Sequence, residues 1–134
     1  MDFVSRVINA DKRSIARLIT LIEEQSDEAR NLLKQLYKFT GNAITIGITG
    51  PPGAGKSSIV NLLAKKLRES NKKVGILAID PTSPFTGGAL LGDRIRMQDL
   101  TLDEGIYIRS MGSRGSLGGL SRASYDAVKV LDAA

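Results

Sequence analysis

The stretch GPPGAGKS, Gly50 to Ser57, decides the fold of this chain. It matches G-x-x-x-x-G-K-[ST], the pattern of a phosphate-binding loop, at every fixed position. Residues 43–49, AITIGIT, precede it and are short, β-branched and largely apolar, as a buried parallel strand is. The residues after it predict an amphipathic helix. Because strand, loop and helix in this order are the context in which the pattern holds phosphates, the sequence predicts an α/β domain built around this loop.

Each residue type in the loop has a physical role in binding phosphate. Gly53 and Gly55 allow backbone conformations and close approaches that a Cβ would block, so successive N–H groups can point at phosphate oxygens. Lys56 supplies a positive charge for the β- and γ-phosphates, and Ser57 supplies a hydroxyl for Mg²⁺. The alternative is a glycine-rich turn that binds nothing. The predicted nucleotide-binding residues are Gly50, Pro52, Gly53, Ala54, Gly55, Lys56, Ser57 and Ser58.

Beyond the loop, helix and strand patterns alternate. Residues 73–79, KVGILAI, predict a second buried strand, which would close a right-handed βαβ unit around the intervening helix. A short helix over 93–100, a strand over 106–109 and a helix over 120–133 follow. We therefore expect a doubly wound, mostly parallel sheet. The expected apolar positions are Ile59, Leu62, Leu63 and Leu67 in the helix after the loop, and Leu120, Ala123, Ala127, Val130 and Leu131 in the last helix.

The N-terminal segment carries helix patterns alone. Residues 11–25 predict an amphipathic helix with Asp11 as its N-cap. A second helix is predicted to start at Ser26 and to stop at Gly41. We expect a helical hairpin that serves packing or the docking of a partner. Its apolar positions are Ile15, Leu18, Ile19 and Ile22 in the first helix, and Ala29, Leu32, Leu33 and Leu36 in the second.

The composition excludes several kinds of chemistry. The 134 residues include no Cys and no His, which rules out disulfides, thiolate or imidazole metal ligands and His-based hydrolysis. Carboxylates, Lys, Arg, hydroxyls, amides and a hard metal ion remain, and these suit phosphoryl transfer. The net charge of +5 reflects either a solvated surface or attraction to anions, and without a basic stripe interleaved with aromatics we expect no nucleic-acid partner. Lacking a signal sequence and any apolar run of ~18 residues, the chain is expected in the cytoplasm without a membrane span.

Two aspartates stand at positions where a metal could bind. Asp80 follows the second predicted strand, at the sheet edge where open α/β sheets bind ligands. It could hold a metal ion through water, or it could be a turn residue in the pair Asp80-Pro81. Asp93 has a similar ambiguity, because it could simply cap the helix that follows it. The residues themselves leave both alternatives open.

Three segments taken together carry a family resemblance. They are GPPGAGKS, then DPTSPFTGGALLGDRIRM from Asp80 to Met97, then SMGSRGSLGGLSRAS from Ser110 to Ser124. In this combination the chain resembles the methylmalonyl-CoA mutase-associated GTPases of the MeaB/ArgK type, from about residue 11 to the end. The second segment is the most diagnostic, because generic P-loop proteins do not carry an Asp-Pro followed by Thr-Gly-Gly and Leu-Gly-Asp.

The resemblance implies a SIMIBI-class P-loop GTPase that binds GTP or GDP with Mg²⁺ and assists an adenosylcobalamin-dependent acyl-CoA mutase of the methylmalonyl-CoA mutase type. Carried onto this chain, it implies that Lys56 contacts phosphate and that Ser57 binds Mg²⁺. It places Asp80 and Asp93 near the metal, as metal-site residues that also join Lys56 in catalysis. Older descriptions of the same family suggest the alternative of an ATP-dependent kinase or ATPase of the arginine/ornithine transport type.

The chain departs from the family pattern in its length. Family members continue into a strand with an acidic group, an Asn-Lys-x-Asp motif that reads guanine, and a dimerisation arm that makes the full-length protein a homodimer. We therefore interpret residues 1–42 as a helical extension and residues 43–134 as the N-terminal part of an incomplete G domain. Without the base-reading motif, no residue selects guanine over adenine. A fragment that binds only nucleotide or a partner is the remaining alternative, and we expect an uncovered strand to leave it marginally stable or self-associated.

Overall fold

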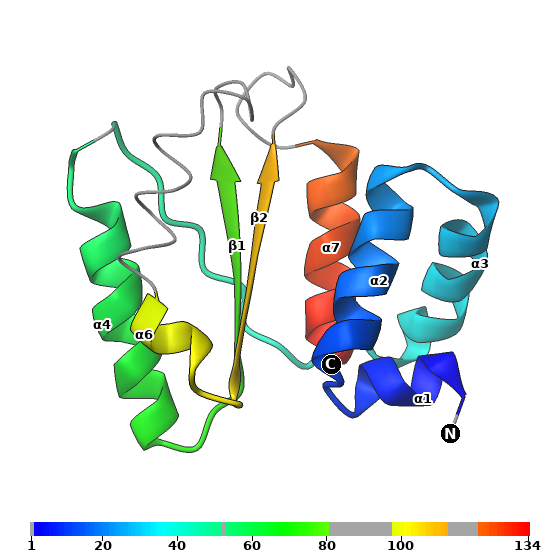
Figure 1. The fold of residues 1–134 in the computed structure, drawn as a ribbon, viewed down its shortest axis with the longest axis horizontal. Helices are drawn as coiled ribbons and strands as arrows, with labels where there is room; N and C mark the ends of the chain where they lie inside the picture. The colour runs from blue at the N-terminus through cyan, green and yellow to red at the C-terminus, as the bar shows by residue number, and fades with distance from the viewer. Residues whose placement is uncertain (1, 52, 81–97, 113–120) are drawn as a thin grey trace. The chain divides into compact units, whose positions relative to one another are not determined.

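The computed structural model describes residues 2–51, 53–80, 98–112 and 121–134. The chain divides into two compact units, which are treated separately below (Figure 1). The first unit comprises Met1–Thr45 and Gly115–Ala134, and the second comprises Ile46–Arg114. The last helix therefore groups with the N-terminal helices. The division at residue 42 that the sequence suggests stays a prediction.

The first unit is helical. It contains α1 (Phe3–Ile8), α2 (Lys12–Glu23), α3 (Asp27–Leu36), the short 3-10 helix η1 (Tyr37–Phe39) and α7 (Arg122–Ala133). Helix α2 lies at the centre, because it packs against α1, α3 and α7 (Figure 1). The predicted helices over 11–25, 26–40 and 120–133 are thus confirmed to within a few residues at each end. The buried apolar residues are Val7, Ile15, Leu18, Ile19, Leu21, Ile22, Ala29, Leu36, Ala127, Val130 and Ala133.

Side-chain caps explain where these helices begin. Asp11 accepts a hydrogen bond from the Ser14 N–H at 3.1 Å, and Ser26 accepts one from the Ala29 N–H at 3.0 Å. Both caps were predicted, and both satisfy N–H groups that have no acceptor inside the first helical turn. Ser121 caps α7 in the same way, by accepting from the N–H three residues later. Gly41 follows the end of α3 and η1 with φ +94, a left-handed conformation that favours glycine.

The second unit contains a small parallel sheet. Its elements are α4 (Lys56–Glu69), β1 (Val74–Asp80), α6 (Gln98–Thr101) and β2 (Ile106–Gly112). Strand β1 pairs with β2 in parallel, from Val74 opposite Ile106 to Asp80 opposite Gly112. Both predicted strands are confirmed, and β2 extends three residues beyond the predicted end. Helix α4 packs on β1 and α6, around a core of Ala64, Leu100 and Ile106.

The predicted strand over 43–49 is wrong. The structure assigns no strand to this segment, and Ile44 and Ile46 are 90% and 58% exposed. The sheet of the described residues has β1 and β2 alone, so the predicted βαβ unit with a strand before the loop is wrong too. An apolar, β-branched pattern records the tendency to be buried, but a strand also needs a neighbour that accepts and donates backbone hydrogen bonds. Among the described residues, no strand supplies that neighbour.

The predicted apolar face of the helix after the loop is wrong in part. Ile59 and Leu62 of α4 are 54% and 68% exposed, whereas Ala64 is buried and Val60 packs beside it. A two-stranded sheet covers only a narrow stripe of a helix, and small Ala64 allows close approach there. In α7 the prediction holds better, because Ala127 and Val130 are buried. Leu120, and residues 93–97 of the predicted short helix, lie outside the described residues.

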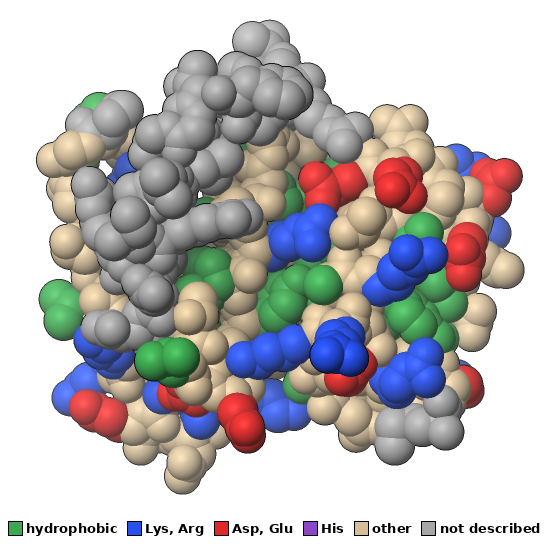
Figure 2. All heavy atoms as spheres, viewed as in Figure 1, with side chains coloured by type: hydrophobic (Ala, Val, Ile, Leu, Met, Phe, Trp, Pro, Cys, Tyr) green, Lys and Arg blue, Asp and Glu red, His purple; other side chains and the backbone are tan. Residues whose placement is uncertain are grey.

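The surface carries charges of both signs. On the face seen in Figure 2, Lys and Arg side chains are interspersed with Asp and Glu. Within the part of the chain that the structure describes, no helix combines the length and the apolar character needed to cross a bilayer.

Candidate phosphate-binding site

The predicted loop has the backbone shape that its glycines allow. Gly53 has φ +80 and Gly55 has φ +91, so both lie in the left-handed region that residues with a Cβ enter at a cost of about 1–2 kcal/mol. The Ala54 N–H donates to the Pro51 carbonyl at 3.2 Å, which closes a tight turn. The Ile59 N–H then donates to the Gly55 carbonyl at 3.1 Å and starts α4. The chain therefore turns sharply at Gly53 and enters a helix directly after Gly55.

The start of α4 differs from the other long helices. Helices α2, α3 and α7 begin with a side chain that accepts a backbone N–H, whereas Gly55 at the N-cap of α4 offers none. The first N–H groups of any helix have no acceptor within the helix, and the helix dipole places about half a positive charge there. An anion is the natural partner for such a helix end. The loop thus has the electrostatic character of a phosphate site.

Lys56 stands against the first residue of the loop. A Cβ at Gly50 would lie 3.7 Å from Cγ and Cδ of Lys56 and 3.6 Å from Cβ of Ala54. The aliphatic part of the lysine therefore lies beside Gly50, and the loop folds back on itself. Lys56 and Ser57 are half-buried, while Gly53, Ala54, Gly55 and Ser58 are exposed.

Asp80 occupies the end of β1 that was predicted for it. It is the last residue of the strand and pairs with Gly112, the last residue of β2. In Figure 1 the N-terminal end of α4 lies toward the same end of the second unit as the two arrowheads. Parallel α/β sheets bind ligands at this carboxyl edge. The loop and the backbone of Asp80 therefore lie at the same end of one unit.

Some predicted site residues fall outside the described part of the chain. Pro52 and Asp93 are among them, and of Asp80 only the backbone is described. Among the described residues, no group of three or more acidic, Cys or His side chains is placed to hold a metal ion. The roles of Ser57, Asp80 and Asp93 in Mg²⁺ binding, and of Lys56, Asp80 and Asp93 in catalysis, stay predictions.

Sequence reasoning missed a second cluster of polar groups. The Asp132 carboxylate of α7 accepts the N–H groups of Gly41, Asn42 and Ala43 at 2.8, 3.1 and 2.9 Å. Three successive amides that converge on one carboxylate form an anion-binding nest, and here the bound anion is a side chain of the same chain. No local signal could have found it, because the partners are about 90 residues apart.

A loop with two left-handed glycines that opens a helix beside parallel strands is typical of P-loop nucleotide-binding domains. Residues 15–134 match the family described as methylmalonyl Co-A mutase-associated GTPase MeaB, and the chain belongs to that family. The resemblance found in the sequence is thereby confirmed.

Individual relatives agree with this assignment. A Pyrococcus abyssi (strain GE5 / Orsay) protein named "Putative GTPase" is 57% identical over 132 residues, which cover 98% of this chain and 41% of that protein. "GTPase ArgK" of Escherichia coli (strain K12) is 35% identical over 135 residues, covering 98% of this chain and 41% of its own length. The Caenorhabditis elegans protein "Methylmalonic aciduria type A homolog, mitochondrial" is 38% identical over 143 residues, covering 96% and 36%. The chain thus spans about two fifths of the length of these relatives.

Proposed function

We propose that this chain supplies the phosphate-binding part of a GTPase that binds GTP and GDP with Mg²⁺. The observation that carries the proposal is the start of α4, where left-handed Gly53 and Gly55 lead into a helix without a side-chain cap. Membership of the MeaB family supports guanine nucleotide as the ligand. The wider fold would then be a doubly wound P-loop domain, with residues 1–42 as a helical extension and residues 43–134 as its first part.

The loop residues fit a nucleotide phosphate. Amides at the start of α4 would bind phosphate oxygens, and the Lys56 ammonium would add charge at the β- and γ-phosphates. The Ser57 hydroxyl is a suitable ligand for Mg²⁺, which prefers oxygen donors and keeps several waters. Asp80 and Asp93 would hold those waters. Positioning and charge, rather than covalent chemistry, are what these groups can contribute to hydrolysis.

The proposed partner is an adenosylcobalamin-dependent acyl-CoA mutase. The family description names association with methylmalonyl Co-A mutase, and one relative is named for methylmalonic aciduria. In this proposal the nucleotide state of the GTPase governs cofactor loading of the mutase, and the full-length protein is a homodimer in the cytoplasm.

A second candidate is an ATP-dependent kinase or ATPase of the arginine/ornithine transport type. The relative in Escherichia coli is called ArgK, but its name also describes it as a GTPase. A chain that binds only nucleotide or a partner, without hydrolysis, is the third. The loop geometry is the same for all three, so the choice depends on which base binds and on turnover.

Calorimetric titration with GDP–Mg²⁺ and ADP–Mg²⁺ tests the proposal. No residue of this chain selects guanine over adenine, so we expect GDP to bind more tightly than ADP only in the full-length protein. In the chain itself we expect Lys56→Ala to weaken the binding of either nucleotide by about tenfold or more, because a charge-assisted contact is worth about 1.5–3 kcal/mol. Lys65→Ala is the matched control, since Lys65 is an exposed lysine on the same helix. Tighter binding of ADP than of GDP by the full-length protein would favour the ATP candidate. No heat with either would contradict nucleotide binding by this chain.

A further inference from the structure

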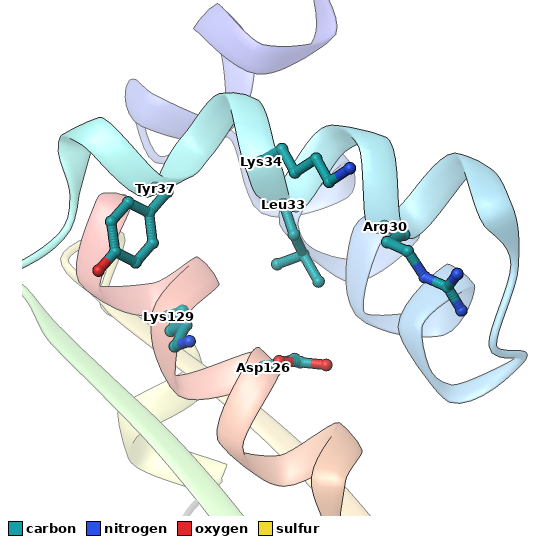
Figure 3. Close-up of a pocket in the computed structure, with 6 residues that line it drawn as sticks. All are labelled: Arg30, Leu33, Lys34, Tyr37, Asp126 and Lys129. Carbon is teal, nitrogen blue, oxygen red and sulfur yellow. The ribbon is translucent and has the colours of Figure 1, made fainter.

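An open groove of about 330 Å³ lies in the first unit, between α7 and the continuous helix formed by α3 and η1. None of its residues belongs to the phosphate-binding loop. Figure 3 shows the side chains around it. They are Arg30, Leu33, Lys34, Tyr37, Asp126 and Lys129.

The groove is elongated because its residues follow helical spacing. Arg30, Leu33, Lys34 and Tyr37 are at i, i+3, i+4 and i+7, which places them on one face of a helix. From the first to the last is a rise of ~10 Å along the helix axis. Lys129 stands on the opposite wall, on α7 (Figure 3). Charges are therefore distributed along both walls and not gathered at one point.

Positive charge dominates the groove. Three cations face one carboxylate, Asp126. Among the described residues, Arg30, Lys34 and Lys129 form no ion pair. The Lys129 ammonium lies 5.8 Å from the centroid of the Tyr37 ring, within the range of a cation–π contact. The cations are thus available to anionic groups from outside the chain.

An apolar surface lies between the charges. The Leu33 side chain points into the space between the two helices (Figure 3). Tyr37 is 68% exposed, although a tyrosine ring is among the side chains that stabilise interfaces most when covered. An occupant that matches the groove therefore needs apolar surface as well as negative charge.

We propose that this groove binds a short acidic segment of a partner protein. Arg30 and Lys34 are four residues apart on α3, a rise of ~6 Å, which is close to the ~6.6 Å between alternate residues of an extended chain. A segment of the form Glu-x-Glu-x-Leu can pair its carboxylates with these cations and lay its leucine on Tyr37. A single phosphate or carboxylate would occupy only part of the groove and would leave Leu33 and Tyr37 uncovered. Spacing and charge together favour the peptide.

Fluorescence anisotropy with a labelled peptide tests the proposal. The probe contains the core Glu-Ser-Glu-Ser-Leu, and a scrambled peptide of equal charge is the comparison. We expect the combined change Arg30→Glu and Lys34→Glu to weaken binding by about tenfold or more, through reversal of two charge pairs. The matched control is Arg13→Glu with Arg17→Glu, another exposed cation pair four residues apart, on α2, and we expect a change below about twofold. Tyr37→Ala should also weaken binding of the probe, although it leaves the net charge of the protein unchanged.

Circular dichroism shows whether each variant is folded. If the Arg30/Lys34 double variant does not fold, Tyr37→Ala takes its place in the binding test. The proposal is overturned if the probe does not bind, or if the two double variants lose affinity equally. It is also overturned if the scrambled peptide binds as tightly as the probe. It is also overturned in favour of nucleic acid or free phosphate if an oligonucleotide or pyrophosphate displaces the probe at lower concentration than unlabelled peptide. Concentration-dependent dimerisation that the Arg30/Lys34 variant abolishes would identify a second copy as the occupant instead.

Discussion

Replacing Asp132 by Asn tests how strongly α7 holds the segment that leads to the phosphate-binding loop. The carboxylate accepts three backbone N–H groups, from Gly41, Asn42 and Ala43. Asn keeps one acceptor oxygen and loses the charge. A hydrogen bond to a charged group contributes about 1.5–3 kcal/mol and a neutral one about 0.5–1.5 kcal/mol, and water replaces part of either at an exposed site. We expect the free energy of unfolding to fall by about 1–2 kcal/mol in total.

The dependence on pH follows from the pKa of Asp132. Burial raises this pKa, but the three N–H donors together lower it by more than burial raises it. The pKa therefore lies below its ordinary value of 3.8. A group whose pKa is lower in the folded state stabilises fully above the unfolded value and loses that contribution as pH falls through the folded value. The difference in stability between the parent chain and Asp132→Asn should therefore be constant above about pH 5 and shrink below about pH 3.8.

Urea unfolding followed by circular dichroism measures the difference, and amide hydrogen exchange at residues 41–43 localises it. Asp126→Asn is the matched control, because it removes the same charge from α7 without backbone N–H partners among the described residues. Equal stability of the parent chain and Asp132→Asn at pH 7, with unchanged exchange at residues 41–43, would refute the reasoning.

Three further substitutions test other contacts. Gly55→Val should weaken GDP binding and lower stability by about 1–2 kcal/mol, because φ +91 is strained for a β-branched residue; calorimetry and urea unfolding measure both. Gly105→Ala would place a Cβ against the guanidinium of Arg68, so the guanidinium must leave Asp103, which it contacts at 3.0 Å. The free energy of unfolding should fall by about 0.5–1 kcal/mol through the loss of this half-exposed pair. The fall should vanish in an Arg68→Ala background, and a double-mutant cycle tests this. Ala64→Leu should destabilise by about 1–3 kcal/mol through overpacking under α4, and unchanged urea unfolding would contradict that packing.

Local signals predicted much of the fold. Asp11 and Ser26 start their helices because a cap depends on residues three positions away. The strands predicted at 73–79 and 106–109 follow from short apolar runs bounded by polar residues, and both form within three residues of those bounds. The left-handed glycines 53 and 55 were predictable from the loop pattern alone.

The failures concern partners distant in sequence. The segment 43–49 has a strand pattern, but whether a strand forms depends on a neighbour that its own residues cannot specify. Helix α4 turns Val60 and Ala64 toward the sheet, not Ile59 and Leu62, because the sheet decides which stripe is covered. The groove between α3 and α7 required knowing that the last helix joins the first ones. Of the site, the loop was predictable, whereas the Asp132 contact was not.

The exposed isoleucines have a practical meaning for work with the chain in solution. Ala43 to Thr49 contains no charge and no proline, and its β-branched residues are turned largely to water. Short uncharged segments of this kind stack readily on copies of themselves into cross-β ribbons. When the chain is concentrated, we therefore expect aggregation to start at this segment. Replacing Ile46 by lysine should delay the rise of turbidity and of thioflavin fluorescence, as gatekeeper charges do.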